Sequence, residues 1–357
     1  NKAGLIETVG SGEPRIDFLG NTKGALLLEP TRSNLITYSN GFDNATWEKG
    51  GGGTAPTPLV SANQGISPDG SNNAFKLELN LNGGTTSSDR SRLTDNFTGV
   101  TSTDYTFSFY AKAYSSSEVG KVVKFSVDNS SGDTLFTLTS EWKRFVFVGT
   151  STGTNINQHI QLRGNESTSD SVTMLLYGYQ AEQGSYATSY IPTYGSAATR
   201  SADVCNNAGN DQVINSTEGV LYAEISALAN DGTNRMISLS DGVSTTSNAT
   251  LYFTTTTNQI RFVYEISSVL QCSIISTIDV LQDNKFAIVY KLNRFELWGN
   301  GVKLGEDTSG SVNPSGTFTK LSFLRGASQL PFYGNVKDVR VYNTALTDAE
   351  LQQLTTI

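Results

Sequence analysis

The sequence predicts an all-β protein made of two β-sandwich (jelly-roll) domains, with an irregular N-terminal arm and one short C-terminal helix. The chain of 357 residues carries 34 Gly, 17 Phe and 15 Tyr. Aromatic residues and Thr favour pleated, half-buried strands, whereas Gly, Asn and Ser favour turns. Short segments of alternating polar and apolar residues recur between these turns. At roughly 100–200 residues per domain, the length corresponds to two domains.

Residues 1–32 are predicted to form an N-terminal docking arm. Ile16 and Phe18 alternate with charged residues, as in an edge strand. The brief apolar run Ala25–Leu28 is stopped by Pro30. Strands this short are not stable alone, so we expect the arm to dock onto a copy of the chain or onto another protein.

Residues 33–193 are predicted to form the first sandwich. About seven strands fit within them, separated by polar turns, which is typical of a sandwich or jelly roll. The predicted strands are Asn34–Ser39, Ala74–Leu79, Asp104–Ala113, Val122–Val127, Trp142–Val148, His159–Arg163 and Ser171–Tyr179. The run Gly50–Gly53 is expected to be a flexible loop, because consecutive glycines punctuate regular structure.

Residues 194–217 are predicted to be a linker, and residues 218–357 a second sandwich. The pair Asn300-Gly301 signals a type I′ hairpin turn, because both central positions of that turn need a positive φ. Thr347 and Glu350 have the spacing of a capping box, which predicts the C-terminal helix. The predicted strands are Gly219–Ile225, Arg235–Leu239, Thr250–Phe253, Gln259–Tyr264, Lys285–Tyr290, Arg294–Trp298, Lys320–Leu324 and Gly334–Tyr342.

Composition argues against several classes of function. The single His cannot build a multi-histidine metal site, and the two Cys cannot build a four-cysteine site. A formal net charge of −8 argues against nucleic acid, since phosphate contacts need clustered Lys and Arg. No apolar run is long enough to span a bilayer. We therefore expect no nucleic-acid partner and no membrane insertion.

Catalysis is also disfavoured. A Ser-His-Asp or Cys-His arrangement would have to use His159, which we expect to be a polar position on the solvent face of a strand. Glu265 and Glu296 stand alone on their predicted strands, so no carboxylate pair supports glycoside hydrolysis. The prediction is a non-enzymatic protein with no cofactor, and a lyase or hydrolase is the least favoured alternative.

Two features leave alternatives open. Asp128 and Asp133 bound an oxygen-rich turn and are candidate ligands of a structural calcium ion, as is the turn Asn230–Asn234, although such clusters are usually plain turns. Cys205 and Cys272 either form a disulfide or stay reduced, as they would in a protein assembled in the cytosol.

Sugar binding is the functional hypothesis that the aromatic residues support. Aromatic faces stack on the apolar faces of sugar rings, and polar side chains bind the hydroxyls. Packing in the core is the competing and commoner role for each candidate. The candidate glycan-binding residues are Tyr110, Tyr114, Tyr179, Tyr186 and Tyr190. The tryptophans Trp47, Trp142 and Trp298 are predicted to be core residues.

Several pieces of the first 200 residues follow one another in a particular order. They are Pro14–Phe18, Leu26–Ile36, Phe107–Lys112, Trp142–Phe145 and Gln180–Thr193. In this order they resemble a recurrent segment of bacteriophage fibre and virion-surface proteins, followed by a jelly roll similar to carbohydrate-binding modules. Similar modules occur in secreted bacterial proteins, so the resemblance is more specific for architecture than for a phage origin.

The second predicted sandwich carries a resemblance of its own. The Asn300-Gly301 turn, the run Phe332–Asn343 and the helix Leu346–Leu354 resemble laminin-G-like, concanavalin-type sandwiches. This resemblance implies a fold and does not imply an activity.

These resemblances imply a structural and adhesive protein of a phage virion surface, either a tail fibre or a capsid decoration subunit, that binds a glycan or host receptor. Its expected partners are other virion proteins or copies of itself, contacted through residues 1–32, so we expect a homo-oligomer. The alternative is the carbohydrate-binding region of a secreted, extracellular bacterial protein that degrades glycans or mediates adhesion.

Overall fold

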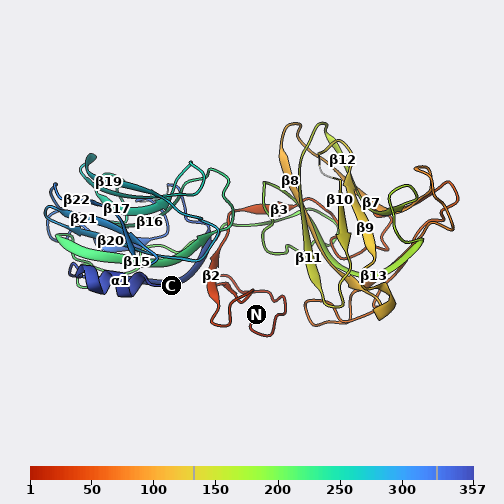
Figure 1. Ribbon diagram of the computed structural model, residues 1–357, viewed down its shortest axis with the longest axis horizontal. Coiled ribbons are helices and arrows are strands. Elements are labelled where there is room, and N and C mark those ends of the chain that lie inside the picture. Colours follow the sequence, from red (N-terminus) through yellow and green to blue (C-terminus); the bar gives the residue numbers. More distant parts are fainter. Residues whose placement is uncertain (132, 327–328) are drawn as a thin grey trace. The chain divides into compact units, whose positions relative to one another are not determined.

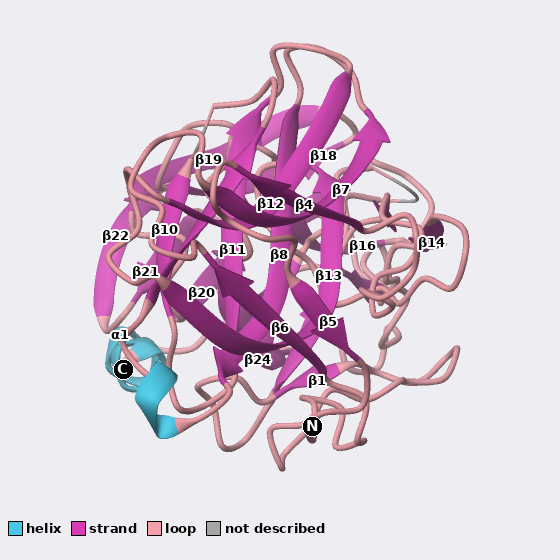
Figure 2. Cartoon of the chain, turned by 90° about the vertical axis from the view of Figure 1, so that its right-hand side faces the viewer, coloured by secondary structure: helices cyan, strands magenta, loops and turns pink. Residues whose placement is uncertain are grey.

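The computed structural model describes residues 1–131, 133–326 and 329–357. These residues form many short strands, one α-helix and one 3₁₀ turn, η1 (Ser116–Glu118), and Figure 2 shows how strongly strands dominate. The predicted all-β class is confirmed.

The described residues form two compact units whose boundaries differ from the predicted ones. The unit here called the N-terminal domain comprises residues 3–8 and 31–201. The unit here called the C-terminal domain comprises residues 1–2, 9–30 and 202–357. Most of the predicted arm therefore belongs to the C-terminal domain, and the predicted linker is divided between the two domains.

The N-terminal domain contains two five-stranded antiparallel sheets, here called sheets 1 and 2, together with one two-stranded sheet. In spatial order, sheet 1 contains β10 (Thr134–Thr137), β9 (Val122–Val127), β12 (Asn155–Arg163), β7 (Arg90–Thr98) and β4 (Glu48–Gly52). Sheet 2 contains β11 (Lys143–Thr150), β8 (Asp104–Ala113), β13 (Ser171–Gln183), β6 (Phe75–Asn80) and β5 (Leu59–Ser61). The small sheet pairs β14 (Ala198–Arg200) with β3 (Arg32–Asn34).

An aromatic core lies between sheets 1 and 2. Along β8, Phe107 and Phe109 are buried and alternate with side chains on the outer face. Phe125 of sheet 1 meets Phe107 with ring centroids 5.6 Å apart. Trp47 is fully buried, as predicted, and its Nε1 donates a hydrogen bond to the carbonyl of Tyr38 at 2.8 Å. Each buried aromatic side chain removes a large apolar area from water, which stabilises the sandwich.

The glycine run that was predicted to be a flexible loop is instead part of a strand. β4 pairs antiparallel with β7, so Gly50–Gly52 lie in a sheet. A Cβ atom on Gly51 would lie 2.8 Å from the carbonyl oxygen of Ala55. The close approach of two backbones therefore explains glycine at this position, and flexibility does not.

The C-terminal domain consists of sheets 3 and 4, both antiparallel (Figure 1). Sheet 3 contains β1 (Ile16–Asp17), β2 (Ala25–Leu28), β24 (Gly334–Tyr342), β15 (Glu218–Ala227), β20 (Asn284–Lys291), β21 (Arg294–Gly299) and β22 (Val302–Asp307). Sheet 4 contains β19 (Val269–Thr277), β18 (Gln259–Ile266), β17 (Asn248–Phe253), β16 (Arg235–Ser240) and β23 (Lys320–Ser322). Their shared core includes Phe262 and Phe286, both fully buried.

Residues of the predicted arm complete sheet 3. β2 pairs with β24, and Leu28 at its end is 3% exposed in the core of the C-terminal domain. The Arg15 guanidinium binds Glu29 Oε2 at 2.7 Å and also pairs with Asp203. The expectation that this segment docks onto another chain is therefore corrected for β2, because its strand partner is β24 of its own chain.

The single described α-helix, α1 (Asp348–Thr355), begins as predicted. Thr347 and Glu350 form the capping box reciprocally. Leu351 is fully buried against Trp298, which is 5% exposed, so the helix packs on the outer face of sheet 3 (Figure 1). With eight residues, α1 is too short to cross a membrane, and no longer apolar helix occurs in the described part of the chain.

The predicted turn and the two cysteines are also resolved. Asn300 and Gly301 have φ values of 52° and 80°, which confirms a turn with two positive φ angles between β21 and β22. Cys205 and Cys272 are free thiols. Burial raises the pKa of both, that of Cys272 to about 12, so neither is a reactive thiolate at neutral pH.

Candidate functional site

The outer face of sheet 2 carries aromatic and basic side chains. On β8, Tyr110 and Lys112 occupy outward positions, and Tyr114 follows the end of the strand. Strand pairing places Leu175 of β13 beside Lys112 and Tyr177 beside Tyr110. Because alternate residues of a strand share a face, these side chains form one continuous surface.

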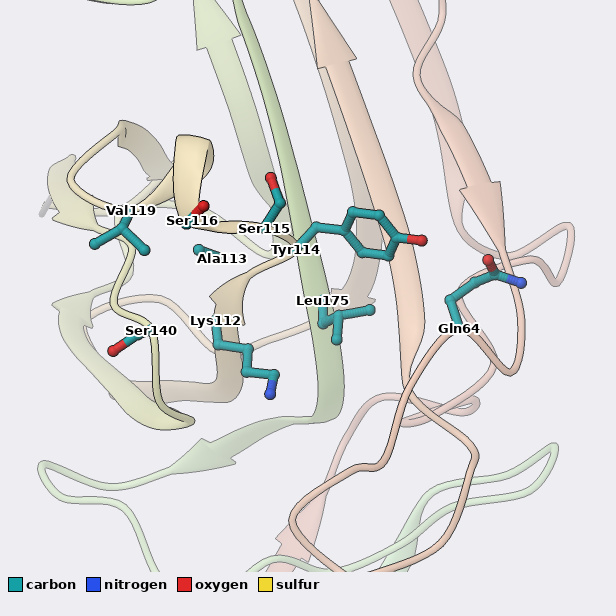
Figure 3. Close-up of a pocket in the computed structure, with 9 residues that line it drawn as sticks. All are labelled: Gln64, Lys112, Ala113, Tyr114, Ser115, Ser116, Val119, Ser140 and Leu175. Carbon is teal, nitrogen blue, oxygen red and sulfur yellow. The ribbon is translucent and has the colours of Figure 1, made fainter.

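A pocket of about 480 Å³ opens where this surface ends (Figure 3). Tyr114 projects towards Gln64, Leu175 lies below Tyr114 in this view, and Lys112 lies further to the left, between Leu175 and Ser140. Hydroxyl groups of Ser115 and neighbouring serines add further polar groups to the lining. The described lining residues thus combine an aromatic ring, an amide, an ammonium group and hydroxyls, and they include no carboxylate.

The Tyr114 ring is accessible to a ligand. Tyr114 is 45% exposed, which is more than any of the other four candidate tyrosines. The Lys76 ammonium lies 5.4 Å from the ring centroid, which is within the range of a cation–π interaction. The ring is therefore held in place while much of its surface remains open to solvent.

Trp142 lies beside this surface, which corrects the prediction that it is a core residue. It directly precedes β11 and is half-buried. Its Nε1 donates to the carbonyl of Ile66 at 3.0 Å, and the Lys112 ammonium lies 5.5 Å from its ring. The first inward position of β11 belongs to Phe145, so the core does not need a large residue at position 142.

Three tyrosines form an aromatic cluster next to the pocket. The ring centroids of Tyr110 and Tyr177 are 6.2 Å apart, and those of Tyr177 and Tyr190 are 5.6 Å apart. The Tyr177 hydroxyl donates to Asp69 Oδ2 at 2.9 Å, and the Tyr190 hydroxyl lies 2.6 Å from Ser39 Oγ. Burial raises the pKa of Tyr177 and of Tyr190, so both phenols stay neutral. The cluster is anchored by its own hydrogen bonds.

Asp69 supplies a fixed negative charge beneath this cluster. Burial opposes its ionisation, but hydrogen bonds from Asn73, Ser67 and Ser71 outweigh burial and lower the pKa of Asp69 to about 2. All of the described partners of this carboxylate are donors from the N-terminal domain. It therefore holds the loop of residues 67–73 and the Tyr177 hydroxyl in place.

Tyr179 belongs to the core, which corrects its prediction as a glycan-binding residue. It is 0% exposed and stacks on Phe109, with centroids 5.5 Å apart and an interplanar angle of 8°. Simple alternation would place Tyr177 and Tyr179 on the same face. The register shifts between Tyr177 and Gln180, where Gly178 has a φ of 62°, and this bulge turns Tyr179 inward.

The remaining candidate, Tyr186, lies in the loop after β13. It is half-buried, and the Arg32 guanidinium lies 5.1 Å from its ring centroid. Of the predicted tyrosines, Tyr114 lines the pocket, and Tyr110 and Tyr190 lie in the adjacent cluster. Lys112 could have been found from the alternation of β8, whereas Gln64 comes from a distant loop and has no sequence signal.

His159 lies on the outer face of sheet 1 but is not exposed, which corrects its predicted place in solvent. It is 3% exposed, with Nδ1 2.8 Å from Thr94 Oγ1 and Nε2 3.2 Å from Asp128 Oδ2. Thr94 belongs to β7 and Asp128 directly follows β9, the two strands on either side of β12. Burial lowers the pKa of His159 more than Asp128 raises it, so the ring is neutral at pH 7.

The residues predicted to bind calcium face other partners. Asp133 Oδ2 lies 2.8 Å from the Lys124 ammonium, and Asp128 faces His159. In the second predicted turn, Asp231 accepts a hydrogen bond from Arg235 at 2.9 Å. Across residues 1–131, 133–326 and 329–357, no three His, Cys, Asp or Glu side chains gather as a metal site would require, and Gly132 of the predicted loop lies outside the described residues. Calcium binding stays a prediction.

No protein-family model matches the chain, and no curated protein matches it. Among solved structures, it is similar to the CBM40 of Ruminococcus gnavus IT-sialidase bound to α2,3-sialyllactose, with a TM-score of 0.35, 15% identity, and coverage of 43% of this chain and 95% of that chain. It is similar to mouse laminin α1 domains LG4-5, with a TM-score of 0.29, 8% identity, and coverage of 77% and 90%. It is also similar to the CBM22-1-CBM22-2 tandem of Paenibacillus barcinonensis Xyn10C, with a TM-score of 0.30, 10% identity, and coverage of 94% and 100%. Likenesses this distant assign no function to the chain.

Proposed function

We propose that this chain is a non-enzymatic glycan-binding protein and that the Tyr114 pocket is its sugar-binding site. The observation that supports the proposal is the combination, in one pocket of about 480 Å³, of an accessible aromatic ring with amide, ammonium and hydroxyl groups. The lining residues that the structure describes supply no carboxylate for acid–base chemistry on a glycosidic bond.

The chemistry of the lining fits a sugar better than a purely apolar ligand. A sugar ring has one face of C–H groups, which packs on an aromatic ring, and hydroxyls around its edge, which need donors and acceptors. Tyr114 offers the ring, while Gln64 and Lys112 offer polar groups on either side of it (Figure 3). The neutral amide can both donate and accept, so it can satisfy a hydroxyl in either role.

The biological setting that we propose is a phage virion surface, where the protein would serve as a tail fibre or decoration subunit that binds a host glycan. This setting follows from the resemblance of the first 200 residues to bacteriophage fibre and virion-surface proteins. It includes a homo-oligomer and contacts with other virion proteins through those residues of 1–32 that lie outside β2. The alternative setting is a secreted bacterial protein in which the same pocket anchors the chain to a polysaccharide. A stable oligomer in light scattering supports the first setting, and a monomer contradicts it.

A glycan array followed by calorimetric titration tests the binding site. The variant Tyr114→Ala removes the ring, and we expect it to weaken binding of the selected glycan by about tenfold or more, whereas Tyr114→Phe keeps the ring and most of the affinity. The matched control is Tyr194→Ala, because Tyr194 is 85% exposed and lies outside the pocket lining. Failure to bind any glycan, or equal binding by Tyr114→Ala, would contradict the proposal.

A further inference from the structure

The outer face of sheet 4 in the C-terminal domain holds a second pocket of about 210 Å³. Its floor is apolar, because Met236, Tyr252 and Val263 form a small cluster separate from the main core of the domain. These residues come from the adjacent strands β16, β17 and β18. The floor therefore presents an apolar surface on the side of the sheet that faces away from the core.

A chain of hydrogen bonds fixes the polar side of this pocket. Thr250 Oγ1 donates to Asn248 Oδ1 at 2.7 Å, and Asn248 Nδ2 donates to Glu265 Oε2 at 2.9 Å. The Arg325 guanidinium binds the same carboxylate oxygen of Glu265 at 2.6 Å. Asn248 is completely buried and Thr250 is 2% exposed, so this wall is rigidly placed.

A second guanidinium, that of Arg261, lines the pocket and has no carboxylate partner among the described residues. Arg261 Nε and Nη2 both donate to the neutral hydroxyl of Ser273, at 3.0 and 2.8 Å. The Arg261 guanidinium also lies 5.9 Å from the centroid of the Tyr252 ring. Burial raises the pKa of Tyr252 while Arg261 and Arg325 act in the opposite direction, as expected when both cations lie near its hydroxyl.

The lining therefore has an excess of positive charge in an acidic protein. Among the described lining residues, two guanidinium groups, those of Arg261 and Arg325, face one carboxylate, that of Glu265, whereas the whole chain has a formal net charge of −8. Guanidinium groups bind carboxylates with two parallel hydrogen bonds, which makes Arg the preferred residue for recognising this group.

We propose that this pocket binds an acidic sugar, with the ligand's carboxylate held by Arg261 and Arg325 and its ring lying over the apolar floor. A bare small anion would leave Met236 and Val263 without a contact, and a neutral sugar would leave the excess charge unmatched. Asn248 and Thr250 are buried and bonded to one another and to Glu265, so they hold the charged side of the pocket in place. This site is independent of the Tyr114 pocket, since it lies in the other domain.

Titration of the full chain with glucuronate tests the proposal, with glucose, acetate and glucose 6-sulfate as comparison ligands. We expect glucuronate to bind about tenfold or more tightly than glucose or acetate, and added salt to weaken its binding. Arg261→Gln should lower the affinity for glucuronate by about tenfold while the chain stays folded, because the lost hydrogen bonds are to a neutral serine. Circular dichroism verifies the fold.

The matched control is Arg340→Gln, because the Arg340 guanidinium also lies over a tyrosine ring, 5.5 Å from the centroid of Tyr222, but outside the pocket. It should leave glucuronate binding unchanged, as should Tyr114→Ala. Absent or glucose-like binding of glucuronate overturns the proposal. If glucose 6-sulfate binds more tightly than glucuronate, the carboxylate assignment is overturned. If Tyr114→Ala loses glucuronate binding, glucuronate binds in the Tyr114 pocket and the proposed site is wrong.

Discussion

At the scale of single residues, the least expected feature is a group of polar atoms in the aromatic core of the N-terminal domain. Asp95 of β7 and Gln158 of β12 pair across sheet 1 on its inner face. Asp95 Oδ2, both side-chain polar atoms of Gln158 and the Tyr179 hydroxyl have no hydrogen-bond partner among the described residues. In such apolar surroundings, an ionised carboxylate that lacks hydrogen-bond or ion-pair partners raises the free energy of the folded state.

This cost predicts a pH dependence of stability. Burial raises the pKa of Asp95 from 3.8 to about 6, so its contribution to stability is fully present below about pH 4 and is lost as the pH rises through about 6. Asp95→Asn, which stays neutral, should therefore raise the free energy of unfolding at about pH 8 by an amount on the order of 2–3 kcal/mol, and the gain should vanish below about pH 4. Urea unfolding of both proteins at several pH values measures this gain in the free energy of unfolding. The exposed Asp43→Asn serves as the control, and an equal gain at all pH values would refute the electrostatic cause.

At the scale of elements, the sequence predicts strands well where apolar residues alternate cleanly. The predicted bounds Asp104–Ala113 and Val122–Val127 are those of β8 and β9. β7 was missed, because its outer face carries Arg and Thr and its inner face includes Asp95. β4 was missed because its glycines suggest a loop. In both cases tertiary pairing decides the structure against local preference.

The same limits apply to the candidate site. Alternation along β8 was enough to place Tyr110 on the outer face of sheet 2 and to bring Tyr114 to the pocket. Alternation failed for Tyr179, because a bulge of one residue changes the face of every later side chain. No sequence pattern before Gly178 predicts this bulge. Gln64 reaches the pocket through loop geometry, which no local pattern encodes.

The capping box of α1 gives a prediction at this scale. The Thr347 hydroxyl accepts from the backbone N–H of Glu350, and the helix buries Leu351 against sheet 3. Thr347→Ala leaves that N–H without its partner and should lower the stability of the C-terminal domain by about 1 kcal/mol. Thr347→Ser retains the hydroxyl and should change little. Hydrogen exchange of residues 348–355 measures fraying directly, and unchanged exchange in the Ala variant would contradict the assigned role.

At the scale of the whole molecule, the residues of the C-terminal domain are not contiguous in the sequence. Residues 9–30 contribute β1 and β2 to sheet 3, residues 31–201 then form most of the N-terminal domain, and the chain completes the C-terminal domain from residue 202 onward. The N-terminal domain is thus largely an insertion within the sequence of the C-terminal domain. A boundary drawn by composition misses this arrangement, because pairing of β2 with β24 joins segments about 300 residues apart.

This order predicts different behaviour for fragments of the two domains. The fragment 31–201 keeps both sheets of the N-terminal domain and should unfold cooperatively, whereas the fragment 202–357 lacks β2, Leu28 and the Arg15–Asp203 ion pair. Loss of a buried Leu side chain alone costs about 2–5 kcal/mol, so 202–357 should unfold at a clearly lower denaturant concentration than the C-terminal domain of the full chain. A synthetic peptide of residues 9–30 should restore much of the difference by pairing with β24, and a peptide with Leu28→Ala should restore less. If 202–357 alone matched the full chain in stability, β2 would contribute nothing to the stability of sheet 3. The first 30 residues would then be available for contacts with other proteins.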